Sequence, residues 1–183
     1  MPKRTNARKN ILDRWLACRA CRLQQYRRQV VLGRGVIPAP LLFIGEAPGK
    51  SEDLRGEAFI GPSGRLLNRA MQDAAEMVGC PIPTFYVTNV IACRPCDVKS
   101  GPNRQPLPDE IICCRPRLAD TVALVKPEVV VLLGKVAETE AKAVCPDGIG
   151  LYHPAYIIRR GGTQSVDYRA FVRGLSSAFE RVG

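Results

Sequence analysis

Residues 39–49 read APLLFIGEAPG, an apolar run of strand length that ends in a loop rich in glycine and proline. An apolar run bounded by turn residues is typical of a strand that is buried on both faces. A second run of this kind, PEVVVLLG, occupies residues 127–134. Fully buried strands belong to parallel sheets that are covered by helices on both sides. The two stretches therefore predict an α/β protein.

The rest of the chain alternates extended and helical patterns. Strands are expected in TFYVTNVIAC (84–93) and in GIGLYHPAYII (148–158), of which the second runs into a loop. Helical patterns cover residues 10–30, 63–79, 109–125, 135–144 and 166–182. Strands that alternate with helices predict a three-layer α/β/α sandwich around a central, mainly parallel four-stranded sheet.

Three of these helices carry more detailed expectations. Ser63 is expected to be the N-cap of the helix over 63–79, and Gly79 lies just past its end. Pro116 is expected to interrupt the helix over 109–125. The last helix carries an apolar stripe that is typical of core packing, formed by Tyr168, Phe171, Val172, Leu175 and Phe179.

Length and composition place the chain among folded globular proteins. It has 183 residues, 46% of them apolar, which predicts a single domain over 1–183 with a basic N-terminal arm over about 1–10. No apolar run approaches the roughly 20 residues of a membrane helix. The basic N-terminus lacks the apolar stretch of a signal peptide. We therefore expect a cytoplasmic, bacterial-type protein with no membrane contact.

The charge is strongly positive and unevenly distributed. The formal net charge is +10, and residues 1–34 contain ten Lys and Arg against one acid, Asp13. Such a basic segment indicates a polyanionic partner, most commonly nucleic acid. The alternative is that the charge serves solubility alone. No pattern indicates a protein partner, so a monomer is expected.

Eight cysteines indicate a metal or cluster site, because an intracellular chain does not keep structural disulfides. Cys18 and Cys21 form one Cys-x2-Cys pair, and Cys93 and Cys96 form a second, with 71 residues between the pairs. Zinc knuckles usually lie closer together, whereas an iron–sulfur cluster accepts four thiolates from distant segments. The pattern leaves the remaining ligands open among Cys96, Cys113 and Cys114. Cys80 and Cys145 are expected to be buried fillers.

The only histidine, His153, follows a predicted strand. Three polar segments end strands in this way, namely GEAPG, TNV and YHPA. In parallel sheets the carboxyl ends of the strands meet at one edge, and ligands bind there. We therefore expect the three segments to build one site.

The same segments carry a family resemblance. GEAPGKSEDLRGEAFIGPSGRLLNRAM (45–71) closely resembles the first motif of the family 4 uracil-DNA glycosylases, the iron–sulfur branch of that superfamily. The later motifs follow in the family's order, and they are YVTNVIACRP (86–95), NRQPLPDEIICCRP (103–116), LLGKVA (132–137) and YHPAYIIR (152–159). The resemblance extends from about Cys18 to Arg159.

The resemblance implies a structural [4Fe-4S] cluster. Its first two ligands would be Cys18 and Cys21, and its third would be Cys93. The fourth family ligand immediately precedes Arg-Pro, which corresponds to Cys114 rather than Cys113. Zinc, or a shift to Cys96 or Cys113, remains an alternative.

The resemblance also implies an activity, the removal of a base, most commonly uracil, from DNA. Such a monofunctional glycosylase flips the base out of the helix and hydrolyses its N-glycosidic bond, which leaves an abasic site. His153 would bind the base carbonyl as it gains negative charge. Asn89 would read the base edge, because an amide both donates and accepts hydrogen bonds. Glu46 would position or activate the attacking water and offset the positive charge on the sugar.

Further residues would bind the substrate. Phe59 would stack on the base, and Glu52 would shape the pocket and help to exclude a bulkier pyrimidine, with the backbone of Ala47 beside it. The residues HPAYII would form a loop that enters the minor groove, with Tyr156 or Ile157 as the wedge. The GPSG segment, which contains Ser63, would bind a DNA phosphate through helix N-terminal amides.

One departure from the family leaves further functions open. Only 18 residues separate Gly134 from His153, where the family usually has a longer stretch. A pocket opened by this shortening could accept a bulkier modified base, such as a hypermodified cytosine of phage DNA, in anti-phage defence. Two more functions remain open, a catalytically silent, cluster-containing DNA-binding module and a metal-dependent nuclease.

Overall fold

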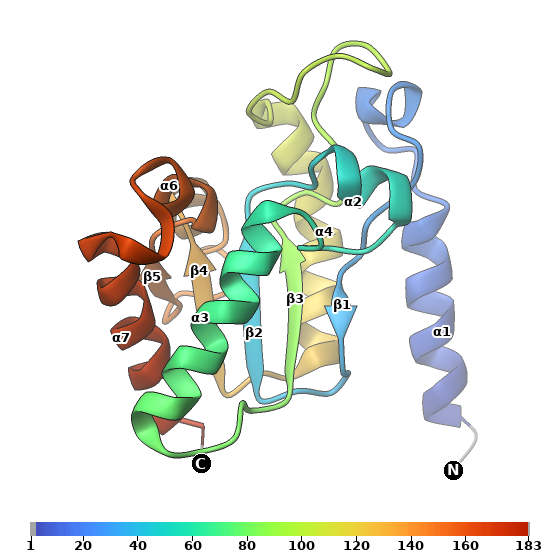
Figure 1. Ribbon diagram of the computed structural model, residues 1–183. Helices are drawn as coiled ribbons and strands as arrows, with labels where there is room; N and C mark the ends of the chain where they lie inside the picture. Colours follow the sequence, from blue (N-terminus) through green and yellow to red (C-terminus); the bar gives the residue numbers. More distant parts are fainter. Residues whose placement is uncertain (1–2, 183) are drawn as a thin grey trace.

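A computed structural model describes residues 3–182, with side chains from residue 9 onward. Its sheet has the strand order β1-β3-β2-β4-β5 (Figure 1). The strands are β1 (Arg34–Gly35), β2 (Leu41–Gly45), β3 (Phe85–Asn89), β4 (Val129–Leu133) and β5 (Ile149–Leu151). The last four are parallel, as the sequence predicts. A short antiparallel edge strand, β1, adds a fifth strand that its two residues gave no pattern to predict.

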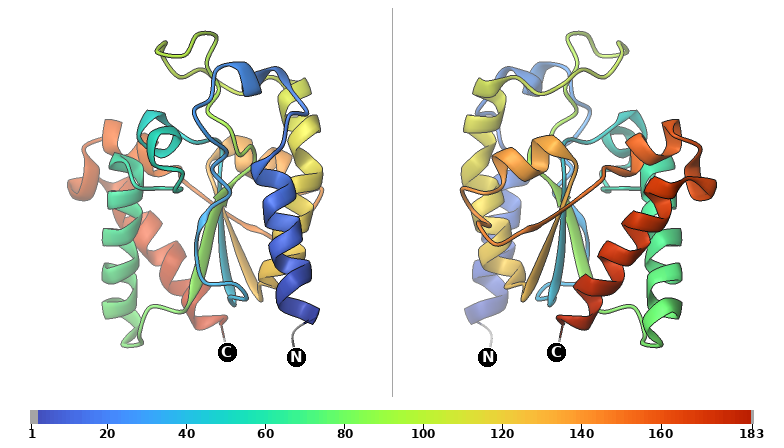
Figure 2. Two further views of the ribbon diagram at one scale, coloured as in Figure 1. Left: turned by 90° about the vertical axis from the view of Figure 1, so that its right-hand side faces the viewer. Right: turned by 90° about the vertical axis from the view of Figure 1, so that its left-hand side faces the viewer.

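Helices cover both faces of the sheet (Figure 2). One face carries α3 (Pro62–Val78) and α7 (Val166–Glu180), which pack against each other. The other face carries α1 (Lys3–Leu16), α4 (Pro108–Val125) and α5 (Lys135–Glu140). Each face has its own apolar cluster, and the predicted stripe of α7 lies in the first of them. The three-layer α/β/α sandwich is thus confirmed.

Short elements gather beyond the carboxyl ends of the strands (Figure 1). They are α2 (Lys50–Arg55), α6 (Pro154–Arg159), and the 3-10 turns η1 (Arg22–Gln25) and η2 (Gly162–Gln164). The helical pattern over 10–30 is only partly realised, because α1 ends at Leu16 and the chain continues as a loop with one 3-10 turn. The basic arm forms part of α1, and its side chains up to Arg8 lie outside the described residues.

Two details of the helix ends bear on the predictions. The N-cap of α3 is Gly61 rather than Ser63, because Pro62 occupies the first helical position, where its missing N–H is not needed. Gly79 ends α3 in a left-handed conformation, as predicted.

The other helix-related expectations concern Pro116 and membrane spans. Pro116 lies inside α4 without ending it. Because proline has no N–H, the carbonyl of Ile112 lacks its hydrogen bond within the helix. Ile112 is exposed, so water can replace this hydrogen bond. Within the described part of the chain, no helix combines the length and apolar character needed to cross a membrane.

Candidate functional site

A cavity of about 300 Å³ opens where β2 and β3 end and α6 begins. Six of its lining residues were predicted from the sequence to bind substrate or to take part in catalysis, and they are Ala47, Glu52, Phe59, Ser63, Asn89 and His153. The remaining lining residues are Gly49, Lys50, Ser51, Gly61, Pro62, Asn103 and Ala155. The expected meeting of the three polar segments at one edge of the sheet is therefore realised.

Asn89 is the last residue of β3, and its side chain borders the cavity while being only 2% exposed. Its Oδ1 atom is buried without a hydrogen-bond partner. A Cβ atom on the neighbouring Gly45 would lie 2.6 Å from this oxygen and 2.5 Å from the Phe59 ring, so only glycine fits there. A buried unpaired acceptor is costly, by about 1–3 kcal/mol. The cavity is thus lined by a residue whose Oδ1 has no hydrogen-bond partner.

His153 is the N-cap of α6, and its Nδ1 accepts a hydrogen bond of 3.1 Å from the amide of Ala155. This bond leaves the ring proton on Nε2, which makes Nε2 a hydrogen-bond donor. Burial, with a further contribution from Arg159, lowers the pKa of His153 to about 4. The imidazole is therefore a neutral donor at physiological pH.

Phe59 lies between Gly45 and His153 and is largely buried. Its ring centroid is 6.2 Å from that of His153, with the two planes tilted by 39°. Phe59 has a positive φ of 54°, which is rare for a residue with a bulky side chain. Gly64 makes this turn possible, since a Cβ there would lie 1.7 Å from the Phe59 carbonyl oxygen.

Glu52, in α2, directs its carboxylate to the turn before α3. Its Oε1 accepts hydrogen bonds from the amides of Ile60 (3.1 Å) and Gly61 (2.7 Å). The amide of Gly61 is thus already occupied by an anion of the protein. A phosphate at the GPSG segment could use only the first-turn amides of Ser63 and Gly64, which have no acceptor within the helix.

Glu46 directly follows β2 but does not line the cavity. Its side chain is half-buried, and burial raises its pKa. Among the described residues it has no ion-pair partner, so no positive charge counteracts this effect.

The HPAYII segment is a helix, α6, and not the expected loop. Pro154 at the first helical position and the His153 cap favour a helix start. Ile157 is fully buried in the core, so it cannot be the wedge without leaving that core. Tyr156 is 37% exposed and stacks on Tyr152 with ring centroids 5.3 Å apart. Of the two predicted wedge residues, only Tyr156 is on the surface.

The segment between Gly134 and His153 forms α5, a turn and β5. A second cavity of about 560 Å³ lies beside it and shares His153 with the first cavity. Its lining includes Lys135, Glu138 and Tyr152. Open space therefore adjoins His153 on the side of α5 and β5.

Asn103 lines the cavity although the sequence did not single it out. It belongs to the loop between β3 and α4, and its Oδ1 accepts a 2.6 Å hydrogen bond from the buried Arg94. Arg94 also donates to the carbonyls of Lys99 and Gly101. Asn103 begins the family motif NRQPLPDEIICCRP, and this position was the signal in the sequence that could have found it.

A separate cavity is lined by five cysteines, which are Cys18, Cys21, Cys93, Cys113 and Cys114. Burial raises the pKa of the Cys93 thiol to about 11, and Cys114 and Cys21 raise it further, against the effect of Arg27. Burial likewise raises the pKa of Cys21, with contributions from Cys114 and Cys113. The thiols from three distant segments therefore lie close enough to interact.

Two of these sulfur atoms accept hydrogen bonds. Arg27 donates to Sγ of Cys93 at 3.1 Å, and the amide of Ala92 donates to Sγ of Cys114 at 3.4 Å. Cys96 is buried outside the cavity, with its Sγ near the carbonyl of Arg94. Cys145 and Cys80 pack in or against the apolar clusters, as expected of fillers.

The cysteine cavity suits an anionic iron–sulfur cluster by its chemistry, since soft sulfur donors, apolar walls and the cations Arg27 and Arg117 surround it. Among the described residues, no three His, Cys, Asp or Glu side chains are placed to hold a single metal ion. Among these residues the structure therefore shows neither a zinc site nor an assembled ligand set for a cluster.

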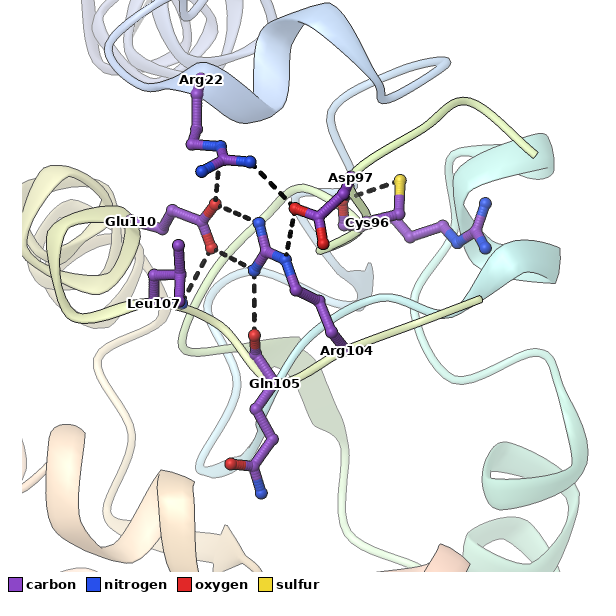
Figure 3. Close-up of polar contacts among 8 residues, drawn as sticks. Arg22, Cys96, Asp97, Arg104, Gln105, Leu107 and Glu110 are labelled. Carbon is purple, nitrogen blue, oxygen red and sulfur yellow. Dashed lines mark hydrogen bonds and ion pairs between the residues drawn. The ribbon is translucent and has the colours of Figure 1, made fainter. Parts of the chain in front are cut away.

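An ion network around the buried Glu110 ties the cysteine segments together (Figure 3). The fully buried carboxylate of Glu110, in α4, binds Arg104 through two bonds of 2.7 and 2.8 Å and lies 3.9 Å from Arg22. Asp97 bridges the same two arginines, at 2.9 Å from Arg22 and 3.0 Å from Arg104. Arg22 follows Cys21, and Glu110 precedes Cys114 by one helical turn. The network therefore joins the two segments that carry these cysteines.

The sequence of this chain has relatives among known proteins. A family model described as the uracil DNA glycosylase superfamily matches residues 32–175, from before β2 to inside α7. Several curated proteins named type-4 uracil-DNA glycosylase are similar as well. The chain is 32% identical to that of Archaeoglobus fulgidus over 174 residues, covering 82% of this chain and 83% of the relative. It is 31% identical to that of Thermotoga maritima over 166 residues, covering 81% and 82%.

A further relative, from Saccharolobus solfataricus, is 36% identical over 125 residues, which cover 68% of this chain and 54% of the relative. The chain thus spans about half the length of this protein but most of the other two. The chain belongs to the uracil DNA glycosylase superfamily and, within it, to the type-4 family.

Proposed function

We propose that this protein is a monofunctional DNA glycosylase that removes uracil and leaves an abasic site. The observation that carries the proposal is that Asn89, whose Oδ1 lacks a hydrogen-bond partner, lines one cavity together with the neutral donor His153 and the ring of Phe59. The names of the relatives support uracil as the base. They give no support to a glycosylase for modified cytosine, to a silent DNA-binding module or to a nuclease.

Recognition of the base follows from the two polar groups. Uracil presents an N–H at position 3, and cytosine presents an unprotonated nitrogen there. An Asn89 Oδ1 acceptor therefore binds uracil and repels cytosine. Phe59 supplies a flat apolar face for the extracted base. Glu52 is held by two amides, so it forms a rigid wall that limits the size of the base.

Bond cleavage uses His153 and Glu46. As the glycosidic bond breaks, the departing base gains negative charge at the oxygen of position 2. A neutral Nε2–H donor, fixed by the Ala155 amide, stabilises this charge without having to transfer a proton. The carboxylate of Glu46 positions the attacking water and offsets the positive charge on the sugar. The oxygen of the water forms a bond to C1′ as the C1′–N1 bond breaks, the proton that the water releases passes to the Glu46 carboxylate, and the base leaves as an anion that takes up a proton from solvent.

DNA binding uses the surface around the cavity. Lys50 and Ser63 line the mouth and are placed to contact backbone phosphates. Tyr156 is exposed on α6 and is the wedge that fills the vacated stack. The net charge of +10 supplies the attraction to DNA that does not depend on sequence. We place this reaction inside the cell, where its DNA substrate is found.

A [4Fe-4S] cluster is part of this proposal, with Cys18, Cys21, Cys93 and Cys114 as ligands. The hydrogen bonds to the sulfur atoms of Cys93 and Cys114 support their selection over Cys96 and Cys113. When bound, the cluster serves a structural purpose, as it links η1, the end of β3 and α4.

The test uses end-labelled oligonucleotides that contain uracil, thymine or a bulky modified cytosine at one position, with alkali to cleave abasic sites. We expect cleavage at uracil alone, and unchanged cleavage in EDTA. Cleavage only at the modified cytosine would contradict the choice of uracil. An absence of alkali-sensitive sites with every substrate would contradict a glycosylase.

A further inference from the structure

Arg117 is a buried arginine in the middle of α4, only 1% exposed, that faces the end of β3. Its Nη1 donates to Oγ1 of Thr88 at 2.9 Å. Its Nη2 donates to the carbonyl of Asn89 at 2.5 Å and to that of Val90 at 2.7 Å. One guanidinium thus holds three successive residues around the base-reading asparagine.

The charge of Arg117 has no carboxylate partner among the described residues. Its three acceptors are neutral, and its Nε is buried without any partner. Burial of a cation is expensive unless an opposite charge compensates it. The structure therefore calls for an anion near this side chain.

The place for that anion adjoins Arg117. The side chain lines the cysteine cavity, together with Arg27 and the five cysteines, and no carboxylate of the described residues lines this cavity. Four thiolates that bind an iron–sulfur cluster would bring net negative charge to this position. The guanidinium would then lie between the cluster and the end of β3. The negative charge of the cluster would compensate its positive charge, and the end of β3 would accept its hydrogen bonds.

We propose that Arg117 is a positioning residue that couples the cysteine site to base recognition. Its positive charge is balanced by the cysteine site when a cluster is bound there. Its planar guanidinium holds the backbone that positions Asn89 at the base cavity. This inference rests on the proposed function and its cluster. Arg117 touches no base; it acts through the carbonyls of Asn89 and Val90.

Two substitutions separate the charge from the fork. Arg117→Lys keeps a cation but lacks the planar fork and reaches less far, so it cannot reproduce the three bonds. Arg117→Met removes both the charge and the fork. The matched control is Arg115→Met on the same helix, whose side chain is exposed and lies 3.7 Å from Glu140. All proteins are prepared with the cluster loaded.

Two readouts are compared, the rate at which a chelator bleaches the visible absorption of the cluster and the kcat and KM for a uracil oligonucleotide. For Arg117→Met we expect faster bleaching and a lower kcat. For Arg117→Lys we expect bleaching close to wild type and a kcat reduced by as much as about 10²-fold, the size of effect that a misplaced reacting group produces. The KM of Arg117→Lys should change little, because phosphate contacts lie elsewhere.

A wild-type kcat in Arg117→Lys, or bleaching as fast as that of Arg117→Met, would overturn the proposal. If Arg117→Met does not fold, Arg117→Lys alone decides between these outcomes. A wild-type protein that lacks a cluster or does not excise uracil would contradict the proposed function instead, before any variant is compared.

Discussion

At Asn89, a single oxygen atom carries much of the case for base recognition. Because Oδ1 is buried and unpaired in the free protein, it gains a hydrogen bond only when a donor enters the cavity. Asn89→Ala should therefore keep the fold and reduce uracil excision by about 10²–10³-fold, the usual effect of losing one aligned polar group. Single-turnover excision measures this loss.

The control for this prediction is Asn68→Ala. Asn68 lies on α3 and accepts a hydrogen bond from Arg34 away from the cavity. Its excision rate should equal that of wild type. Equal rates for wild type and Asn89→Ala would remove Asn89 from the site.

His153 links stability to pH. Its pKa is about 4 in the folded protein, against 6.5 ordinarily, so the unfolded chain takes up a proton first as the pH falls. The free energy of unfolding should therefore decrease as the pH falls from about 6.5 to about 4. Above about pH 6.5 this group should cause no further change in the free energy of unfolding. Urea titrations of wild type and His153→Gln, compared across this range, isolate the effect.

The difference between the two proteins is the informative quantity, because carboxylates that titrate in both cancel in it. A wild-type excess of stability that grows on acidification would show that His153 is stabilised as a cation, and the neutral-donor role would be wrong.

At the scale of elements, Glu110 connects α4 to its surroundings. Burial raises the pKa of Glu110, but hydrogen bonds from Arg104 and from the Leu107 amide outweigh this effect and lower it. Glu110→Gln leaves Arg104 partly unpaired and should reduce the free energy of unfolding by about 3 kcal/mol. Asp97→Asn is the matched control, since Asp97 is exposed, and should cost less than about 1 kcal/mol. Urea denaturation measures both, and equal losses would contradict the central place of Glu110.

The central strands of this fold were predictable, whereas β1 and α6 were not. Runs such as LLFIG and VVVLL are largely buried on both faces, so their apolar character alone marked them as strands. The register of these strands then brought Gly45 beside Asn89, which followed from parallel pairing. The two-residue strand β1 and the six-residue helix α6 depend on tertiary contacts that leave no periodic signal. The burial of Ile157 on α6 could not be predicted from the sequence for the same reason.

The whole molecule determines how DNA is approached. A charge of +10 attracts phosphates regardless of sequence, and the release of counterions makes such binding dependent on salt. We expect affinity for uracil-free duplex DNA to fall steeply as salt rises. Replacing Lys3, Arg4, Arg8 and Lys9 by Gln should make this dependence less steep, by up to about 0.9 in logarithmic slope for each phosphate that is no longer neutralised.

Fluorescence anisotropy at several salt concentrations measures the slopes. An unchanged slope in the Gln variant would show that the arm makes no phosphate contact and serves solubility. Excision at saturating DNA should be equal in both proteins, because the arm contains none of the residues proposed for catalysis.

At the scale of the whole molecule, the sequence predicted where the site lies better than it predicted the contacts of the residues within it. The polar segments at strand ends supplied Ala47, Asn89 and His153 to one cavity, and the family resemblance supplied Glu52, Phe59 and Ser63. The unpaired state of Asn89 Oδ1 could not be predicted, because it depends on every neighbour at once. The position of Arg117 could not be predicted either. No pattern in the sequence distinguishes a buried arginine from one that is exposed to solvent.

The ion network around Glu110 bears on how the cysteine segments are held in place. It joins the segment after Cys21 to the helix that carries Cys114 by contacts among side chains alone. These contacts hold the two parts of the chain together without any contribution from the cysteines. The relative position of the two cysteine segments therefore has a support in side-chain contacts that involve no sulfur atom.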